Sequence, residues 1–146
     1  MVGAMSLRIL VIDDERSVGV TLRDMLETLG HTVVAVQNAT DALVKARSKN
    51  FDVAIVDVNL GPGIDGISLT RELRHRFGLR AVIISGFLQG TLKDFASEAA
   101  DAVLAKPFVS SQMEEALARI PLRRDLSAGV PPADAPPYRR AARSAR

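Results

Sequence analysis

Residues 7–15, Leu-Arg-Ile-Leu-Val-Ile-Asp-Asp-Glu, decide the fold of this chain of 146 residues. The apolar part of the stretch is short and contains β-branched residues, which is typical of a strand buried on both faces of a parallel sheet. Two aspartates follow directly, so we expect carboxylates at the carboxyl end of that strand. Buried strands that end in polar residues recur along the rest of the chain.

Four further apolar runs of strand length follow, with amphipathic segments between them. The runs cover residues 32–36, 52–56, 80–84 and 102–105. Apolar residues at helical spacing predict one helix after each strand. The first helix ends at Gly30, the second is capped by Thr40 or Asp41, and the third begins at about Ile64. The fourth spans about 91–98, and the fifth runs from a cap at Ser110 or Ser111 to Ile120. Strands that alternate with helices predict a five-stranded, doubly wound parallel α/β sheet, with strand order 2-1-3-4-5.

The composition excludes several classes of protein. There is no Cys, which rules out thiol catalysis and disulfides. The two His, His31 and His75, are too few for a metal site of three His, and we expect both at the surface. No apolar run approaches the roughly 20 residues that span a membrane. The net charge of +2 is uneven, because residues 121–146 carry six Arg and two Asp, so the basic character belongs to the tail.

We expect one domain over residues 7–121 with short flanks. Residues 1–6 are expected to be a disordered N-terminus or a cloning scar. Residues 122–146 are rich in Pro, Ala and Arg and are expected to be a disordered tail, because such a composition builds no core. The tail is too short for a helix-turn-helix, although its Arg could contact phosphates without sequence preference. We therefore expect no specific nucleic-acid partner and no membrane segment.

Polar side chains stand directly after four of the five strands: Asp13 with Asp14, then Asp57, Ser85 and Lys106. Because ligand sites in such sheets lie beyond the carboxyl ends of the strands, these side chains should converge. Three close carboxylates repel one another, and Mg²⁺ with its preference for oxygen ligands would relieve the repulsion. A lysine and a hydroxyl suit phosphate oxygens. The set therefore predicts phosphoryl transfer to a carboxylate.

Each residue taken alone also fits an ordinary structural role. Asp13 and Asp14 could cap the first helix, Ser85 could belong to a turn, and Lys106 could lie in a solvated loop. Asp57 is harder to explain in this way, because it ends a strand and precedes no immediate helix. The joint placement of the five residues favours the phosphoryl-transfer interpretation.

Five motifs in this order resemble a receiver domain of two-component response regulators, of the chemotaxis-regulator-like type. They are residues 11–15 (Val-Ile-Asp-Asp-Glu), 55–60 (Ile-Val-Asp-Val-Asn-Leu), 63–66 (Gly-Ile-Asp-Gly), 82–86 (Val-Ile-Ile-Ser-Gly) and 106–108 (Lys-Pro-Phe). The resemblance covers about residues 7–120 and implies a flavodoxin-like fold. It implies that Asp57 accepts a phosphoryl group from a histidine kinase. It also implies a Mg²⁺ site made of Asp13, Asp14, Asp57 and the backbone carbonyl of Asn59.

The resemblance further implies that Ser85 is the hydroxyl that reaches the phosphoryl group, that Lys106 is the active-site lysine, and that the Lys106–Pro107 peptide bond is cis. A protein of this kind is a cytoplasmic bacterial phosphoprotein and a switch rather than an enzyme. Its partners are a histidine kinase or histidine phosphotransfer protein and a downstream effector. Dimers can form through the fourth helix, fifth strand and fifth helix.

Two alternatives stay open at this point. The chain could be the terminal receiver of a hybrid histidine kinase rather than a regulator without a DNA-binding output domain. It could also be an aspartyl-phosphate hydrolase, but that class needs a second Asp two residues after the nucleophile, where this chain has Asn59.

The sequence departs from the family pattern at the position three residues before the lysine, which is usually Phe or Tyr. Here it is Val103, which has no ring to move. Phe87, two residues after Ser85, is the candidate substitute, and the simpler alternative is that Phe87 packs the loop. Gly86 and Gly90 flank this loop, so we expect it to be mobile.

Overall fold

The computed structural model describes residues 6–87 and 89–121, and there the chain forms one parallel sheet covered by helices. The strands are β1 (Arg8–Ile12), β2 (Thr32–Val36), β3 (Val53–Asp57), β4 (Arg80–Ser85) and β5 (Ala102–Ala105). The helices are α1 (Arg16–Thr28), α2 (Ala39–Ser48), α3 (Gly66–Phe77), α4 (Gly90–Ala99) and α5 (Ser110–Ala118). The strand order is β2-β1-β3-β4-β5, which confirms the predicted topology.

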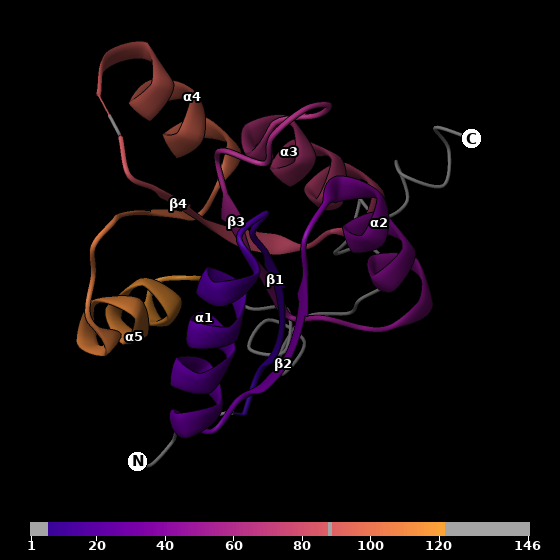
Figure 1. The fold of residues 1–146 in the computed structure, drawn as a ribbon, viewed down its shortest axis with the longest axis vertical. Coiled ribbons are helices and arrows are strands. Elements are labelled where there is room, and N and C mark those ends of the chain that lie inside the picture. Colours follow the sequence, from indigo (N-terminus) through magenta and orange to yellow (C-terminus); the bar gives the residue numbers. More distant parts are fainter. Residues whose placement is uncertain (1–5, 88, 122–146) are drawn as a thin grey trace.

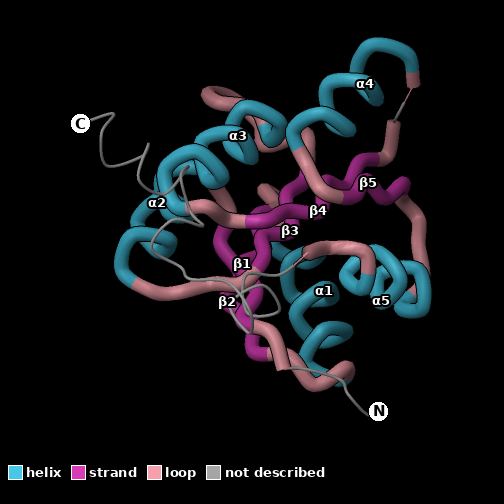
Figure 2. Tube along the Cα trace, turned by 180° about the vertical axis from the view of Figure 1, so that it is seen from behind, coloured by secondary structure: helices cyan, strands magenta, loops and turns pink. Residues whose placement is uncertain are grey.

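The helices lie in two layers. Figures 1 and 2 show α1 and α5 on one face of the sheet and α2, α3 and α4 on the other. Alternate residues of each strand therefore enter different cores: Ile9 and Val11 of β1 pack toward α1 and α5, whereas Leu10 and Ile12 pack toward α2 and α3. Burial on both faces explains why the strands are continuous apolar runs in the sequence.

The starts of α2 and α5 show which residues act as caps. α2 is capped by Asn38, whose side chain accepts the N–H of Asp41 at 2.8 Å, so the expectation of Thr40 or Asp41 was wrong by a few residues. α5 follows Val109, whose own N–H is satisfied by the Gln112 side chain at 2.8 Å. Serine is therefore not the cap of α5.

The first helix gives a further result on the acidic pair. α1 begins after Glu15 and has no side-chain cap, so Asp13 and Asp14 do not cap it. Their carboxylates are thus not explained by the ordinary role weighed above.

Gly66 lets α3 begin against the end of β3. A Cβ built on Gly66 would overlap the main-chain carbonyl of Asp57, and the Gly66 N–H donates to the carbonyl of Val58 at 2.9 Å. No residue with a side chain fits this approach without a shift of the backbone. The start of α3 therefore fixes the strand end that carries Asp57.

Some sequence predictions lie outside the described residues, namely those for residues 1–5 and for the tail at 122–146. Within the described ranges, none of the helices has the length and apolarity needed to cross a membrane.

Candidate functional site

Three carboxylates meet at the carboxyl edge of the sheet. β1 and β3 are parallel neighbours in which Ile12 pairs with Val56, so the residues that follow them come side by side. One oxygen from each of Asp13, Asp14 and Asp57 lies within 4.8 Å of the others. Asp13 and Asp57 are buried, whereas Asp14 is exposed. The cluster is thus open to solvent on the side of Asp14.

Asp13 carries the clearest sign of electrostatic stress. Its Oδ1 accepts the N–H of Glu15 at 2.9 Å, but its Oδ2 has no hydrogen-bond partner in the described part of the chain. Burial, with a further contribution from the charge of Asp57, raises the pKa of Asp13 to about 6, against the opposing effects of the Glu15 N–H and Lys106. A buried carboxylate oxygen without a hydrogen bond, in a group of three carboxylates, suits a hard divalent cation, so these residues fit Mg²⁺.

Lys106 supplies the positive charge at this edge. Its Nζ lies 3.1 Å from Asp57 Oδ2 and 3.6 Å from Asp13 Oδ2. Burial alone lowers the pKa of Lys106, but the hydrogen bond to Asp57 and the charges of both aspartates outweigh burial and raise it. The Lys106 N–H donates to the Ser85 carbonyl at 2.8 Å, and the peptide bond to Pro107 is cis, as the resemblance implied. The main-chain bond to Ser85 therefore fixes Lys106 at the end of β5, from where its ammonium group reaches Asp57.

Asn59 belongs to the same edge through its main chain. Its N–H donates to Asp57 Oδ1 at 3.1 Å, while its side-chain oxygen accepts the N–H of Gly61 at 3.3 Å. The two bonds orient the Asp57 carboxylate and direct the Asn59 side chain into the following turn. The Asn59 backbone thus lies beside the acidic cluster.

Ser85 ends β4 next to this cluster, but its hydroxyl is engaged elsewhere. The hydroxyl donates to the Phe87 carbonyl and accepts the Phe87 N–H, both at 3.0 Å. The Phe87 side chain is 63% exposed, so it does not pack the loop as the simpler alternative required. Sequence reasoning missed the link between these two residues. Val103 is partly buried and packs against the core under α2, α3 and α4.

The two histidines lie away from the acidic cluster, and one of them corrects an expectation. His75 is exposed, but His31 is half-buried and its Nδ1 accepts the Leu7 N–H at 3.0 Å. Burial lowers the pKa of His31, with partial opposition from the charge of Glu114. His31 therefore ties the turn after α1 to the chain just before β1.

Sheet order, helix layers and acidic edge together define the class of receiver-like α/β domains. Within this class, the family model described as response regulator receiver domain matches residues 9–118. The chain therefore belongs to the response regulator receiver domain family. Proteins of this family work in bacterial two-component signalling with histidine kinases and downstream effectors.

Two sequence relatives show how the domain is used in longer proteins. The chain is 35% identical over 130 residues to the virulence sensor protein BvgS of Bordetella pertussis, covering 80% of this chain and 10% of BvgS. It is 35% identical over 123 residues to the response regulator MprA of Mycobacterium ulcerans, covering 80% of this chain and 49% of MprA. The chain thus spans half or less of these relatives.

Solved structures agree with the fold. The response regulator TrrA of Thermotoga maritima in complex with Mg²⁺ and BeF is 29% identical, with a TM-score of 0.70, covering 79% of this chain and 98% of that one. A response regulator of Burkholderia pseudomallei with a phosphorylated aspartic acid, a calcium ion and citrate is 31% identical, with a TM-score of 0.71, covering 77% of this chain and 66% of that one.

Proposed function

We propose that this chain is a phosphorylation-dependent signalling switch with Asp57 as the phosphoacceptor. The observation that carries the proposal is the placement of Asp57 between two carboxylates and the Lys106 ammonium, 3.1 Å away. An Asp57 oxygen forms the new P–O bond while the P–N bond of a phosphohistidine breaks and the imidazole leaves. The donor is a histidine kinase or a histidine phosphotransfer protein.

The acidic cluster would hold the metal that this reaction needs. Asp13, Asp14, Asp57 and the main-chain carbonyl of Asn59 would be the oxygen ligands for Mg²⁺, which would supply positive charge beside the phosphoryl oxygens. Lys106, which follows β5 at the same edge of the sheet, offers a second positive charge. The buried Oδ2 of Asp13 supports this assignment because the described residues leave it without a hydrogen bond.

The output of the switch passes through Ser85 and Phe87. A phosphoryl group on Asp57 offers acceptor oxygens to the Ser85 hydroxyl. That hydroxyl has one proton, so a bond to the phosphoryl group ends its donation to the Phe87 carbonyl. The two states of Asp57 thus interact differently with the loop, which is the requirement for a shift of population.

The residue two positions after the acceptor favours a switch over a hydrolase. Asn59 has no acid or base to offer, and its side-chain oxygen accepts the Gly61 N–H.

The chain then signals in the cytoplasm by binding proteins, without specific nucleic-acid contact. Dimers would form through the face made of α4, β5 and α5. The match to BvgS, a sensor protein, favours a second candidate role as the terminal receiver of a hybrid kinase.

Incubation with acetyl phosphate and Mg²⁺ tests the proposal. Intact-mass measurement should show one added phosphoryl group on the wild type and none on Asp57→Asn. Asp41→Asn, an exposed acid of α2, is the matched control and should be modified like the wild type. Undiminished modification of Asp57→Asn would overturn the assignment.

A further inference from the structure

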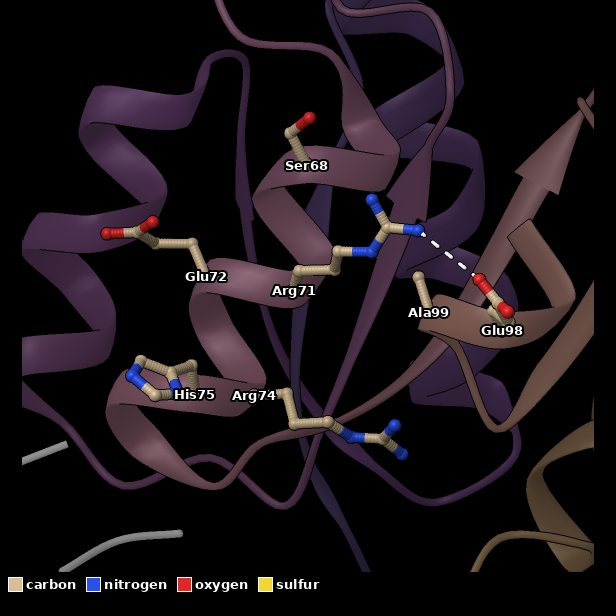
Figure 3. Close-up of a pocket in the computed structure, with 7 residues that line it drawn as sticks. All are labelled: Ser68, Arg71, Glu72, Arg74, His75, Glu98 and Ala99. Atoms are coloured by element: carbon tan, nitrogen blue, oxygen red, sulfur yellow. Dashed lines mark ion pairs between the residues drawn. The ribbon is translucent and has the colours of Figure 1, made fainter. Parts of the chain in front are cut away.

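A groove of about 670 Å³ lies between α3 and α4. Figure 3 shows its residues, with Arg71 and Arg74 reaching toward α4 while Glu72 and His75 point away from it. Glu98 and Ala99 form the opposite wall at the end of α4, shortly before β5 begins. The groove therefore opens toward the amino ends of the strands, away from Asp57, and the acidic cluster makes no use of it.

Two buried alanines and the partly buried Leu92 hold α4 against the domain. Of its ten residues, Ala96 and Ala99 are the buried ones, and the N-cap Gln89 makes no side-chain cap bond. A buried methyl group contributes far less than a buried leucine. Phe95, the largest side chain of α4, is instead 48% exposed beside the groove. The α3–α4 contact thus leaves an aromatic surface open to a partner.

Arg71 bridges the two helices with weak interactions. Its guanidinium carbon lies 5.9 Å from the centre of the Phe95 ring, and its Nη2 lies 3.7 Å from Glu98 Oε1. The side chains of Arg71 and Glu98 are 51% and 76% exposed, and an ion pair with this exposure contributes little. A carboxylate that meets Arg71 in a bidentate geometry would bind more strongly, while Glu98 turns into solvent.

The other charges near the groove are already committed. Arg74 lies 2.8 Å from Asp101, whose largely buried carboxylate also accepts from Arg80 and from the Ala81 N–H. Glu72 pairs with Arg76 at 3.0 Å. The weakest ion pair at the groove is therefore that of Arg71 with Glu98, and Arg71 is the member of this pair that also contacts an exposed aromatic ring. The complementary ligand is acidic and apolar.

We propose that the α3–α4 groove binds a partner protein through a segment that carries a carboxylate beside an apolar side chain. The carboxylate replaces Glu98 on Arg71, and the apolar side chain packs on the exposed Phe95 ring. This interaction surface is separate from the acidic edge and does not depend on the chemistry of Asp57.

A peptide titration tests the proposal on the full, unmodified chain. The probe is acetyl-Glu-Glu-Leu-Glu-Glu-amide, followed by ¹⁵N NMR shifts, with acetyl-Gln-Gln-Leu-Gln-Gln-amide as the uncharged control. The acidic peptide should shift residues 71–75 and 92–99, and the control peptide should not. Arg71→Gln should weaken binding by about fivefold and Phe95→Ala by about tenfold.

Glu98→Gln separates this surface from a general loss of structure, because it removes the competing carboxylate and should tighten binding. Arg47→Gln, an exposed arginine of α2, should leave the affinity unchanged. Shifts elsewhere, no shift at millimolar peptide, or wild-type affinity in Arg71→Gln would each overturn the proposal. Phosphorylation of Asp57 is scored separately by mass, so failure of either proposal leaves the other standing.

Discussion

The Ser85 hydroxyl and the main chain of Phe87 bond to each other in both directions, each at 3.0 Å. We propose that these two hydrogen bonds stabilise the unphosphorylated arrangement of residues 85–87. The same hydroxyl is the group that we expect to turn toward a phosphoryl oxygen. Val103, in the position where the family usually has an aromatic residue, offers no ring to carry the signal. We therefore expect the segment after Ser85 to be the part that moves.

Ser85→Ala should release the loop without phosphorylation. Both hydrogen bonds to Phe87 are lost, at about 1 kcal/mol each, so the amide shifts of residues 86–87 and 89–95 should change in the unmodified protein. Addition of beryllofluoride, a phosphoryl mimic, should then move these residues less than in the wild type. Phe87→Ala keeps both main-chain hydrogen bonds and tests the ring alone, and we expect it to reduce the response as well. Ser97→Ala, on the exposed side of α4, is the control, and equal responses in all four proteins would contradict a role for the pair.

Asp13→Asn should stabilise the metal-free protein while it abolishes phosphorylation. Because burial raises the pKa of Asp13 to about 6 from 3.8, the fold favours the neutral carboxyl. The stability that the folded protein gains from binding a proton at Asp13 is complete below pH 3.8 and is lost as the pH rises through about 6. The variant should therefore gain about 1–3 kcal/mol over the wild type at pH 7.5, and little at pH 4. Urea unfolding in EDTA measures the gain, and a variant less stable than the wild type at pH 7.5 would contradict it.

Magnesium should stabilise the wild type more than Asp14→Ala. A ligand that binds the folded state alone raises stability with its concentration, by about 1–2 kcal/mol at ten or more times its Kd. Asp14 is the exposed member of the cluster, so its removal weakens the site without opening the core. Melting temperatures with and without Mg²⁺ give the comparison. Equal shifts in both proteins would remove Asp14 from the metal site.

Gly66→Ala should destabilise the domain by about 2 kcal/mol or more and slow phosphorylation, because the added methyl overlaps the Asp57 carbonyl. Gly19→Ala is a matched control, since the Cβ at this buried helical position would lie 3.8 Å from Ala35 Cβ, an ordinary contact. That change should stabilise α1 by about 0.5–1 kcal/mol. Chemical denaturation and acetyl phosphate kinetics report both effects, and a neutral Gly66→Ala would show that the strand end can yield.

Protonation of His31 should lower the free energy of unfolding as the pH falls. The folded state lowers the pKa of His31, so its contribution is complete above the unfolded value near 6.5 and is lost as the pH falls through the folded pKa. Protonation also removes the Nδ1 lone pair that accepts the Leu7 N–H. The stability difference between wild type and His31→Gln should therefore shrink from pH 7.5 to pH 5 in urea unfolding, and a difference that stays constant would contradict the prediction.

The sequence predicted the sheet well because the central strands are buried on both faces, which makes apolar runs such as residues 53–56 easy to recognise between turn residues. The convergence of Asp13, Asp57 and Lys106 followed from topology, since parallel strands end at one edge. The link between Ser85 and Phe87 could not be predicted, because it depends on the path of a loop. The contact of Arg71 with Phe95 was equally hidden, since helical periodicity does not tell which helix a side chain will face.

Asp101 anchors two elements to each other at the amino end of the sheet. At the amino end, this one carboxylate fastens α3 through Arg74 and β4 through Arg80 and the Ala81 N–H. At the carboxyl end, three carboxylates repel one another, and the segment that leads into α4 lies between Gly86 and Gly90. We therefore expect a rearrangement that starts at Asp57 to move the amino end of α4 more than its carboxyl end, which Asp101 follows directly.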